Sequence, residues 1–112
     1  AVEGPAIYDL IVSADTLIYF GDLRPVLTAA AVALRPNGRL AFTVERGEDG
    51  ETEEFMLDRS GRYRHIETYL RRELVRAGMV VEILETVDLR LEGGHPVAGF
   101  LVLACKALVS AG

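Results

Sequence analysis

The sequence is short of cysteine, tryptophan and clustered basic residues, and each shortage excludes a class of protein. Its single cysteine, Cys105, rules out an internal disulfide and favours a reducing compartment, so we expect a cytoplasmic protein. Acidic residues outnumber basic ones by 17 to 12, which leaves a net charge of −5, and no basic cluster is longer than Arg71–Arg72. A phosphate-neutralising surface for nucleic acid is therefore not expected.

Long hydrophobic runs are also missing. The longest apolar stretches are about ten residues, short of the ~20 that span a bilayer, and the first residues do not resemble a signal peptide, so no membrane association is expected. His65, His95 and the lone cysteine do not have ligand spacing, so no metal site is predicted. The length of 112 residues suits one domain over 1–112, and the missing initiator Met predicts that this domain is an excised piece.

Half of the residues are hydrophobic, and the first half of the chain groups them into strand, helix and strand. Residues 6–14 are apolar at six of nine positions and β-branched at Ile7, Ile11 and Val12, which predicts a strand buried on both faces of a parallel sheet. Asp22 is a good N-cap for a helix over 23–34. Pro36, Asn37 and Gly38 end that helix, and residues 39–45 predict a second strand.

The second half predicts one helix and a closing hairpin. An acidic, glycine-containing surface loop over 46–53 is followed by a short extended piece over 54–58. Residues 66–77 place apolar side chains on one helical face, and Gly78 stops the helix. Residues 79–91 alternate in part, with Val81 and Ile83 on one face, and residues 97–106 form a final apolar strand joined to them by a short turn.

This order of elements predicts an α/β fold. A strand, a helix and a strand in succession form a right-handed parallel crossover, and the closing hairpin adds an antiparallel element. We therefore expect the end of an open Rossmann-like sheet, with two parallel strands, their crossover helix and an antiparallel C-terminal hairpin.

Several segments, in this order, resemble the C-terminal half of class I S-adenosylmethionine-dependent methyltransferases. YDLIVSADTLIYFGDL is similar to the fourth strand and its loop, and LRPNGRLAFTVE to the fifth strand with its introductory turn. RYRHIETYLRRELVRAGM is similar to the last helix, and MVVEILE with FLVLACK to the final two strands. Within the family, these sequence segments are most similar to those of bacterial methyltransferases that carry TPR repeats.

The resemblance implies a methyltransferase that uses S-adenosylmethionine on a small-molecule or protein acceptor. It also implies what this chain does not contain. The family's cofactor loop follows the first strand and needs glycine for close backbone approach, and an acidic residue after the second strand holds the ribose. Neither is found between 1 and 112, where the only glycine pair is Gly93–Gly94 in a hairpin turn. We therefore expect the isolated chain to bind the cofactor poorly and to lack activity.

The resemblance and the sheet geometry together indicate a site at the carboxyl ends of the two parallel strands. Ser13, Ala14 and Asp15 follow the first strand, where the family holds the methionine part of the cofactor, and Tyr19 is a candidate for substrate binding. The structural alternative is that Asp15 caps the turn and Tyr19 belongs to the core.

Methyl transfer from a sulfonium needs positioning and, for some acceptors, a general base. His65 is the candidate base or substrate-orienting residue, with Tyr63 beside it and Arg46 as a substrate-binding candidate. The alternative for His65 is a residue at the helix entry that bonds to the backbone. A Ser13–His65–Asp15 hydrolase is not expected, because G-x-S-x-G is absent.

If the first strands of the fold are absent, residues 7–13 form an exposed apolar edge. Such an edge is a template for pairing with another chain, so we expect a homodimer through this strand. The competing function is a non-catalytic interaction module that uses the same edge or the 46–61 loop. A nucleotide-binding α/β protein of another family is a third option, disfavoured by the absence of P-loop and Rossmann glycines.

Overall fold

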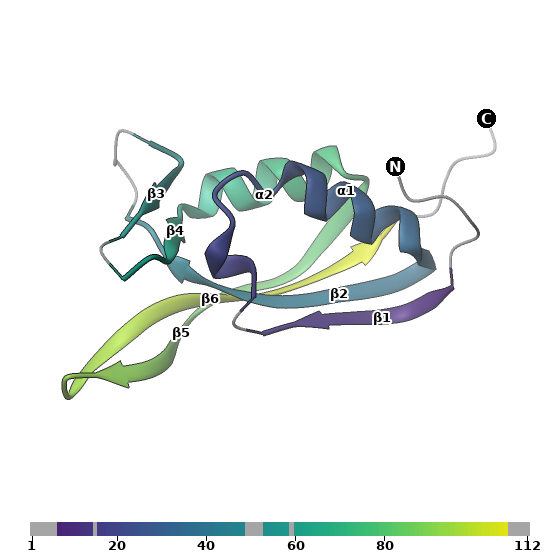
Figure 1. Ribbon diagram of the computed structural model, residues 1–112. Coiled ribbons are helices and arrows are strands. Elements are labelled where there is room, and N and C mark those ends of the chain that lie inside the picture. Colours follow the sequence, from purple (N-terminus) through teal and green to yellow (C-terminus); the bar gives the residue numbers. More distant parts are fainter. Residues whose placement is uncertain (1–6, 15, 49–52, 59, 108–112) are drawn as a thin grey trace.

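The computed structural model describes residues 7–14, 16–48, 53–58 and 60–107, and these form one mixed sheet with two helices on a single face (Figure 1). In chain order the elements are β1 (Tyr8–Ser13), η1 (Leu17–Tyr19), α1 (Arg24–Ala33), β2 (Leu34–Arg46), β3 (Phe55–Leu57), β4 (Tyr63–His65), α2 (Glu67–Arg76), β5 (Met79–Glu92) and β6 (His95–Lys106).

Strand β2 is the centre of the sheet. On one side it pairs with β6, antiparallel, and β6 pairs with β5 along the whole hairpin. On its other side β2 pairs with β1 in parallel along most of its length and with β4 in parallel at Glu45 and Arg46. The short strand β3 pairs with β4. The predicted α/β fold, with a parallel crossover and a closing antiparallel hairpin, is confirmed.

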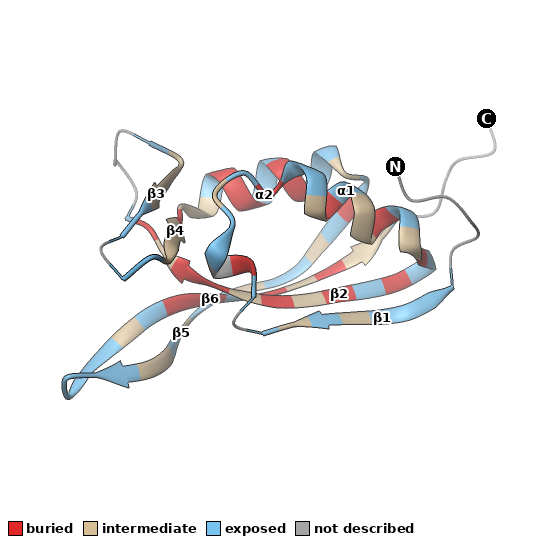
Figure 2. Cartoon of the chain, in the orientation of Figure 1, coloured by how far each residue is buried: buried red, intermediate tan, exposed pale blue. Residues whose placement is uncertain are grey.

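The core lies between the sheet and the helices, and Figure 2 shows the alternation that produces it. Successive side chains of a strand point to opposite faces, so every second residue of β2 and β6 is buried under α1 and α2. The buried side chains from the two strands are Leu40, Phe42, Val44, Phe100, Val102 and Ala104. The helices contribute Leu27, Ala31, Leu70 and Leu74.

Helix α1 has nearly the predicted length, but the predicted N-cap is corrected. The helix begins at Arg24, so Leu23 is its N-cap and has no side-chain cap hydrogen bond, while the Asp22 carboxylate, one residue earlier, accepts the backbone N–H of Arg24 at 3.0 Å. At the other end, Asn37 has φ +67, in the left-handed region that Asn tolerates. This turn is built into β2 as a bulge, because the register with β1 jumps from Tyr8–Leu34 to Leu10–Arg39.

Strand β1 is not buried on both faces, contrary to the prediction. Tyr8, Leu10 and Val12 are exposed, with Leu10 at 56% and Val12 at 65%. The reason is that, within the described residues, no element lies over the sheet face opposite the helices (Figure 1). We call that face the uncovered face.

Two further predictions are corrected. Residues 63–65 form strand β4 against the end of β2, where the sequence had predicted only the approach to a helix. The alternation expected over 79–91 is interrupted by a bulge between Val81 and Ile83. Val81 therefore packs against the core with Leu84, while Ile83 is exposed. Of the predicted 46–53 loop, residues 49–52 lie outside the described part.

Candidate functional site

The carboxyl ends of β1 and β2 lie side by side, as a parallel crossover requires, with Ser13 opposite Phe42. Ser13 is half-buried and Ala14 is exposed, so both border this end of the sheet from the β1 side. Asp15 lies outside the described residues. Tyr19, in η1, is 60% exposed, so it is not the core residue that the structural alternative required.

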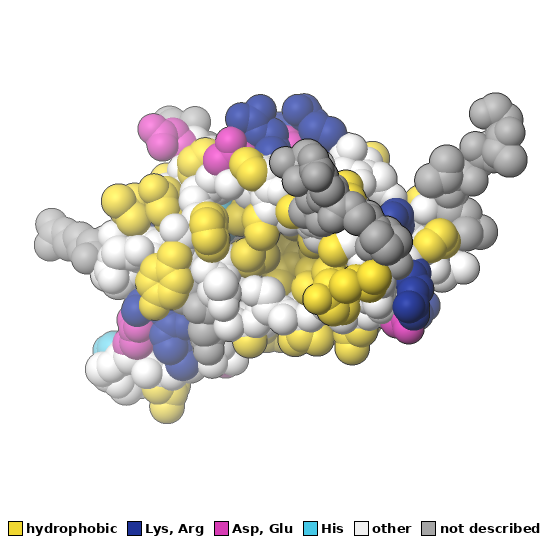
Figure 3. Space-filling view, turned by 45° about the vertical axis from the view of Figure 1, so that its right-hand side comes forward, with side chains coloured by type: hydrophobic (Ala, Val, Ile, Leu, Met, Phe, Trp, Pro, Cys, Tyr) yellow, Lys and Arg dark blue, Asp and Glu magenta, His cyan; other side chains and the backbone are white. Residues whose placement is uncertain are grey.

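An apolar pocket of about 280 Å³ opens beside Ser13, between β1, η1 and α1. Nine residues line it: Ile11, Ser13, Thr16, Leu17, Phe20, Val26, Leu27, Ala30 and Leu40. The face that carries β1 and α1 is hollowed and rich in hydrophobic side chains (Figure 3). Only two hydroxyl side chains border the pocket, and that of Thr16 already donates to the Ala14 carbonyl at 3.2 Å. The pocket therefore offers apolar contacts to a ligand but few polar groups that could orient it.

His65 joins the segment that follows η1 to strand β4. Its ring is fully buried, and Nε2 donates to the backbone carbonyl of Gly21 at 2.9 Å. Burial lowers the pKa of His65 below its usual 6.5, and the bonds to the Gly21 and Phe20 backbone oppose that shift. Within the described chain, Nδ1 is buried without a hydrogen-bond partner. The ring is thus bonded to backbone, as the structural alternative proposed, although from a strand rather than a helix entry.

Aromatic rings surround this contact. Tyr69 stacks on His65 with ring centroids 5.9 Å apart, and Phe55 lies 5.4 Å from Tyr69 and 6.1 Å from Tyr63. Gly21 is required here, because a Cβ on it would lie 2.7 Å from Phe55 and 2.8 Å from Tyr63. A side chain at position 21 would therefore displace the Phe55 and Tyr63 rings, which glycine allows to approach the segment after η1 closely.

A buried acid closes the carboxyl end of β2. Glu45 is only 3% exposed, and its Oε2 accepts hydrogen bonds from Arg62 and Arg90, each at 2.6 Å. Both arginines also contact Glu92, near the tip of the β5–β6 hairpin. The ion cluster ties β2, the β3–β4 hairpin and the β5–β6 hairpin together.

Arg46 is the residue next to Glu45 that the sequence suggested for substrate binding, and its side chain points to the β5–β6 side. Its guanidinium lies 5.8 Å from the Phe100 ring centroid and donates to the Thr86 hydroxyl at 3.3 Å. Arg46 and Ser13 are therefore on different strands of the same sheet end, while Tyr63 and His65 approach it through β4.

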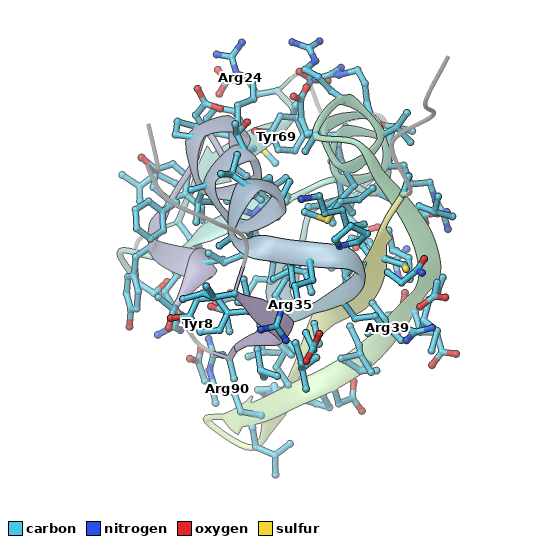
Figure 4. The ribbon with its side chains drawn as sticks, turned by 90° about the vertical axis from the view of Figure 1, so that its right-hand side faces the viewer. Tyr8, Arg24, Arg35, Arg39, Tyr69 and Arg90 are labelled. Carbon is cyan, nitrogen blue, oxygen red and sulfur yellow. The ribbon has the colours of Figure 1, made fainter. Side chains whose placement is uncertain are left out.

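A second, polar pocket of about 190 Å³ lies on the helix side, where Figure 4 shows Arg24 and Tyr69 together. Hydrogen bonds from the Arg24 side chain lower the pKa of Asp22 to about 2. The Tyr69 hydroxyl accepts the Leu23 N–H at 2.8 Å, and burial raises its pKa. Buried Glu73 accepts from Arg72 at 2.9 Å. Three acids and three arginines line this pocket, so its charges balance.

Sequence reasoning missed three residues that hold this region together, Gly21, Arg62 and Arg90, and with them the buried pairing of Glu45. One signal was available, since a charged residue in an otherwise apolar strand, as Glu45 is, needs a partner when it is buried. The partners come from 17 and 45 residues further along, which no local pattern specifies. In the described ranges there is no group of three or more His, Cys, Asp or Glu residues placed to hold a metal ion, and no helix there is long and apolar enough to cross a membrane.

No family model matches the sequence, and no curated protein matches it significantly. Solved structures do match the fold. One is a SAM-dependent methyltransferase from Methanosarcina mazei, with a TM-score of 0.73 and 17% identity over 94% of this chain and 62% of that one. Another is an S-adenosylmethionine-dependent methyltransferase from Mesorhizobium loti, with a TM-score of 0.70 and 20% identity over 92% of this chain and 63% of that one.

A third match is the 1,6-didemethyltoxoflavin-N1-methyltransferase of Burkholderia thailandensis, solved with 1,6-didemethyltoxoflavin and S-adenosylhomocysteine bound. Its TM-score is 0.74, with 19% identity over 96% of this chain and 47% of that one. The chain thus spans less than two thirds of the length of each of these three structures. These likenesses establish the fold: the chain has the sheet arrangement that is shared by S-adenosylmethionine-dependent methyltransferases.

Proposed function

We propose that the chain is part of an S-adenosylmethionine-dependent methyltransferase that acts on a small-molecule or protein acceptor. The observation that carries this proposal is the strand arrangement β1–β2–β6–β5, with the crossover helix α1, which aligns with solved methyltransferases at TM-scores of 0.70 to 0.74. Within the family, the local sequence of these segments favours the bacterial type with TPR repeats. A TPR array in the same polypeptide would test that narrower assignment.

The residues present fit one side of a cofactor site. When bound, S-adenosylmethionine supplies an electrophilic methyl group on a sulfonium. Ser13 and Ala14, with Asp15, would border its methionine part. The apolar pocket beside Ser13 would form a neighbouring surface that excludes water. The described glycines with positive φ all lie in turns elsewhere: Gly61, Gly78, Gly93 and Gly94. The remaining contacts must come from another polypeptide segment, so the isolated chain is inactive.

For the acceptor side, Tyr19 and Arg46 are the proposed binding residues. Tyr19 is exposed beside the carboxyl end of β1, and Arg46 closes β2 against Phe100. His65 and Tyr63 are candidates for transferring a proton or orienting the acceptor. Because the His65 ring is buried and holds the Gly21 carbonyl, we assign it the orienting role, through the segment that carries Tyr19.

Titration calorimetry tests this proposal. S-adenosylmethionine should bind to a polypeptide in which a strand and glycine-rich loop precede this chain, and should show no measurable heat with residues 1–112 alone. Ser13→Val should weaken that binding, whereas Thr43→Val, a similar change at a half-buried residue of β2, should not. Coding sequence upstream of Ala1 without a glycine-rich loop after a strand would contradict the proposal.

The second candidate function is a non-catalytic interaction module. One observation favours it specifically, namely the row of exposed apolar side chains along β1. A gene that encodes this chain alone, with an avid partner at β1 and no cofactor binding, would support the interaction module over the methyltransferase.

A further inference from the structure

The side of β1 away from β2, which we call the β1 edge, has no pairing strand among the residues that the structure describes. Tyr8, Leu10 and Val12 alternate along β1, so their exposed side chains lie on the uncovered face, beside this edge. Edge strands in monomers are usually protected by charge, proline or bulges on the exposed side. Within β1 the one charged residue is Asp9, which contacts Arg35 of its own chain at 3.1 Å. Figure 4 shows Arg35 beside this strand.

We propose that in the chain by itself a second copy occupies the β1 edge, with the two β1 strands antiparallel and Ile11 opposite Ile11 of the other copy. This inference does not depend on the proposed function. A twofold axis perpendicular to the sheet then relates the copies and joins their sheets into one. Because the axis is perpendicular to the sheet, the helices of both copies lie on the same face.

The register follows from the side chains. Directly opposite residues in an antiparallel pair share a face and interact most strongly. With Ile11 at the centre, Leu10 lies opposite Val12 of the other copy, and Asp9 lies opposite Ser13, whose hydroxyl can donate to the carboxylate. With Leu10 at the centre instead, charged Asp9 would lie opposite apolar Ile11. The Ile11 register is therefore the one that matches apolar with apolar and polar with polar.

The same operation explains the apolar pocket. The pocket is lined by Ile11 of β1 and by Val26 and Ala30 of α1, and its hydroxyls are too few to orient a polar ligand. Pairing two β1 strands brings α1 of the second copy next to α1 of the first, over the paired strands. Apolar side chains of each copy then close the pocket of the other, so one contact covers both the strand edge and the hollow.

Light scattering on the eluate of a sizing column tests the association. The wild-type chain should have twice the monomer mass at tens of micromolar. Val12→Lys should be monomeric, because it places a charge directly opposite apolar Leu10 of the other copy. Val75→Lys is the matched control, since Val75 is also 65% exposed but lies on α2, and it should remain dimeric. Circular dichroism checks that both variants fold.

A monomeric wild type, open-ended oligomers, or equal dissociation of the two lysine variants would each overturn the proposal. Disulfide trapping tests the register, in chains that also carry Cys105→Ser. A mixture of Leu10→Cys and Val12→Cys chains should cross-link faster than either chain alone. Identical positions are diagonal in this register, at ~7–8 Å, beyond easy disulfide reach. Faster cross-linking of Leu10→Cys alone would exclude the register centred on Ile11.

Discussion

Strands β1 and β5 each lie at an edge of the sheet, and they differ in how the unpaired side is protected. Strand β5 carries Glu82, Glu85, Asp88, Arg90 and Glu92, and two bulges interrupt its register with β6. Strand β1 carries one charge and is short and apolar. Charge and bulges are how proteins keep a sheet edge unpaired, so β5 is protected and β1 is not. The comparison teaches that, among the residues that the structure describes, the β5 edge of the sheet is protected against pairing and the β1 edge is not.

Strand β5 packs closely over Gly99 of β6, and a substitution there should have the largest effect on stability. A Cβ there would lie 2.6 Å from the Val44 carbonyl oxygen and closer still to the side chain of Leu89, which crosses over the glycine. We expect Gly99→Val to lower the free energy of unfolding by about 3 kcal/mol, because the core cannot accept the extra volume. Urea unfolding measures this. The adjacent exposed Ala98→Val is the control and should change stability by no more than about 0.5 kcal/mol.

The ion cluster around Glu45 should give the next largest effect. Glu45→Ala leaves the partly buried Arg62 and Arg90 facing each other without their shared carboxylate. Removing one partner of a buried pair costs ~3–5 kcal/mol, and partial exposure of the arginines reduces our expectation to about 2 kcal/mol. Glu85→Ala on the exposed edge of β5 should have almost no effect. Equal losses for the two variants in urea unfolding would contradict this account.

On the β1 side, the segment after η1 depends on the protonation of His65. Its folded-state pKa is lowered by burial, so the folded protein favours the neutral ring. Stability should be complete above the unfolded pKa of ~6.5 and fall as the pH drops below it, by at most about 1.4 kcal/mol per pH unit. His65→Gln should remove this slope, whereas His95→Gln should retain it, as measured by unfolding at several pH values.

Converting the β5 edge into one that resembles β1 should alter stability least. Glu85→Val with Asp88→Val removes two exposed acids and should change the free energy of unfolding by about 0.5 kcal/mol or less. Light scattering should nevertheless show larger, concentration-dependent species, because two edges are then open to pairing. Glu85→Lys with Asp88→Lys is the control and should not enlarge the oligomer. An unchanged mass for the valine variant would show that charge is not what protects β5.

Local sequence signals were sufficient for most of the fold. The Asn37–Gly38 turn and the Gly78 stop each act within a few residues, and the structure has a helix before each of them. The candidate site was less predictable. Ser13 and Ala14 do border the carboxyl ends of the strands, and their cofactor role stays a prediction. Strand β4 was missed because three residues carry too little periodicity to be recognised.

What the sequence by itself determined is the order of the two helices and the long strands and the apolar character of β1, because hydrophobic period and turn residues are local properties. What only the tertiary structure decided is which of these surfaces are covered. The buried pairing of Glu45 with Arg62 and Arg90, the His65 bond to Gly21 and the openness of the β1 edge all depend on segments that meet in space after being distant in the chain.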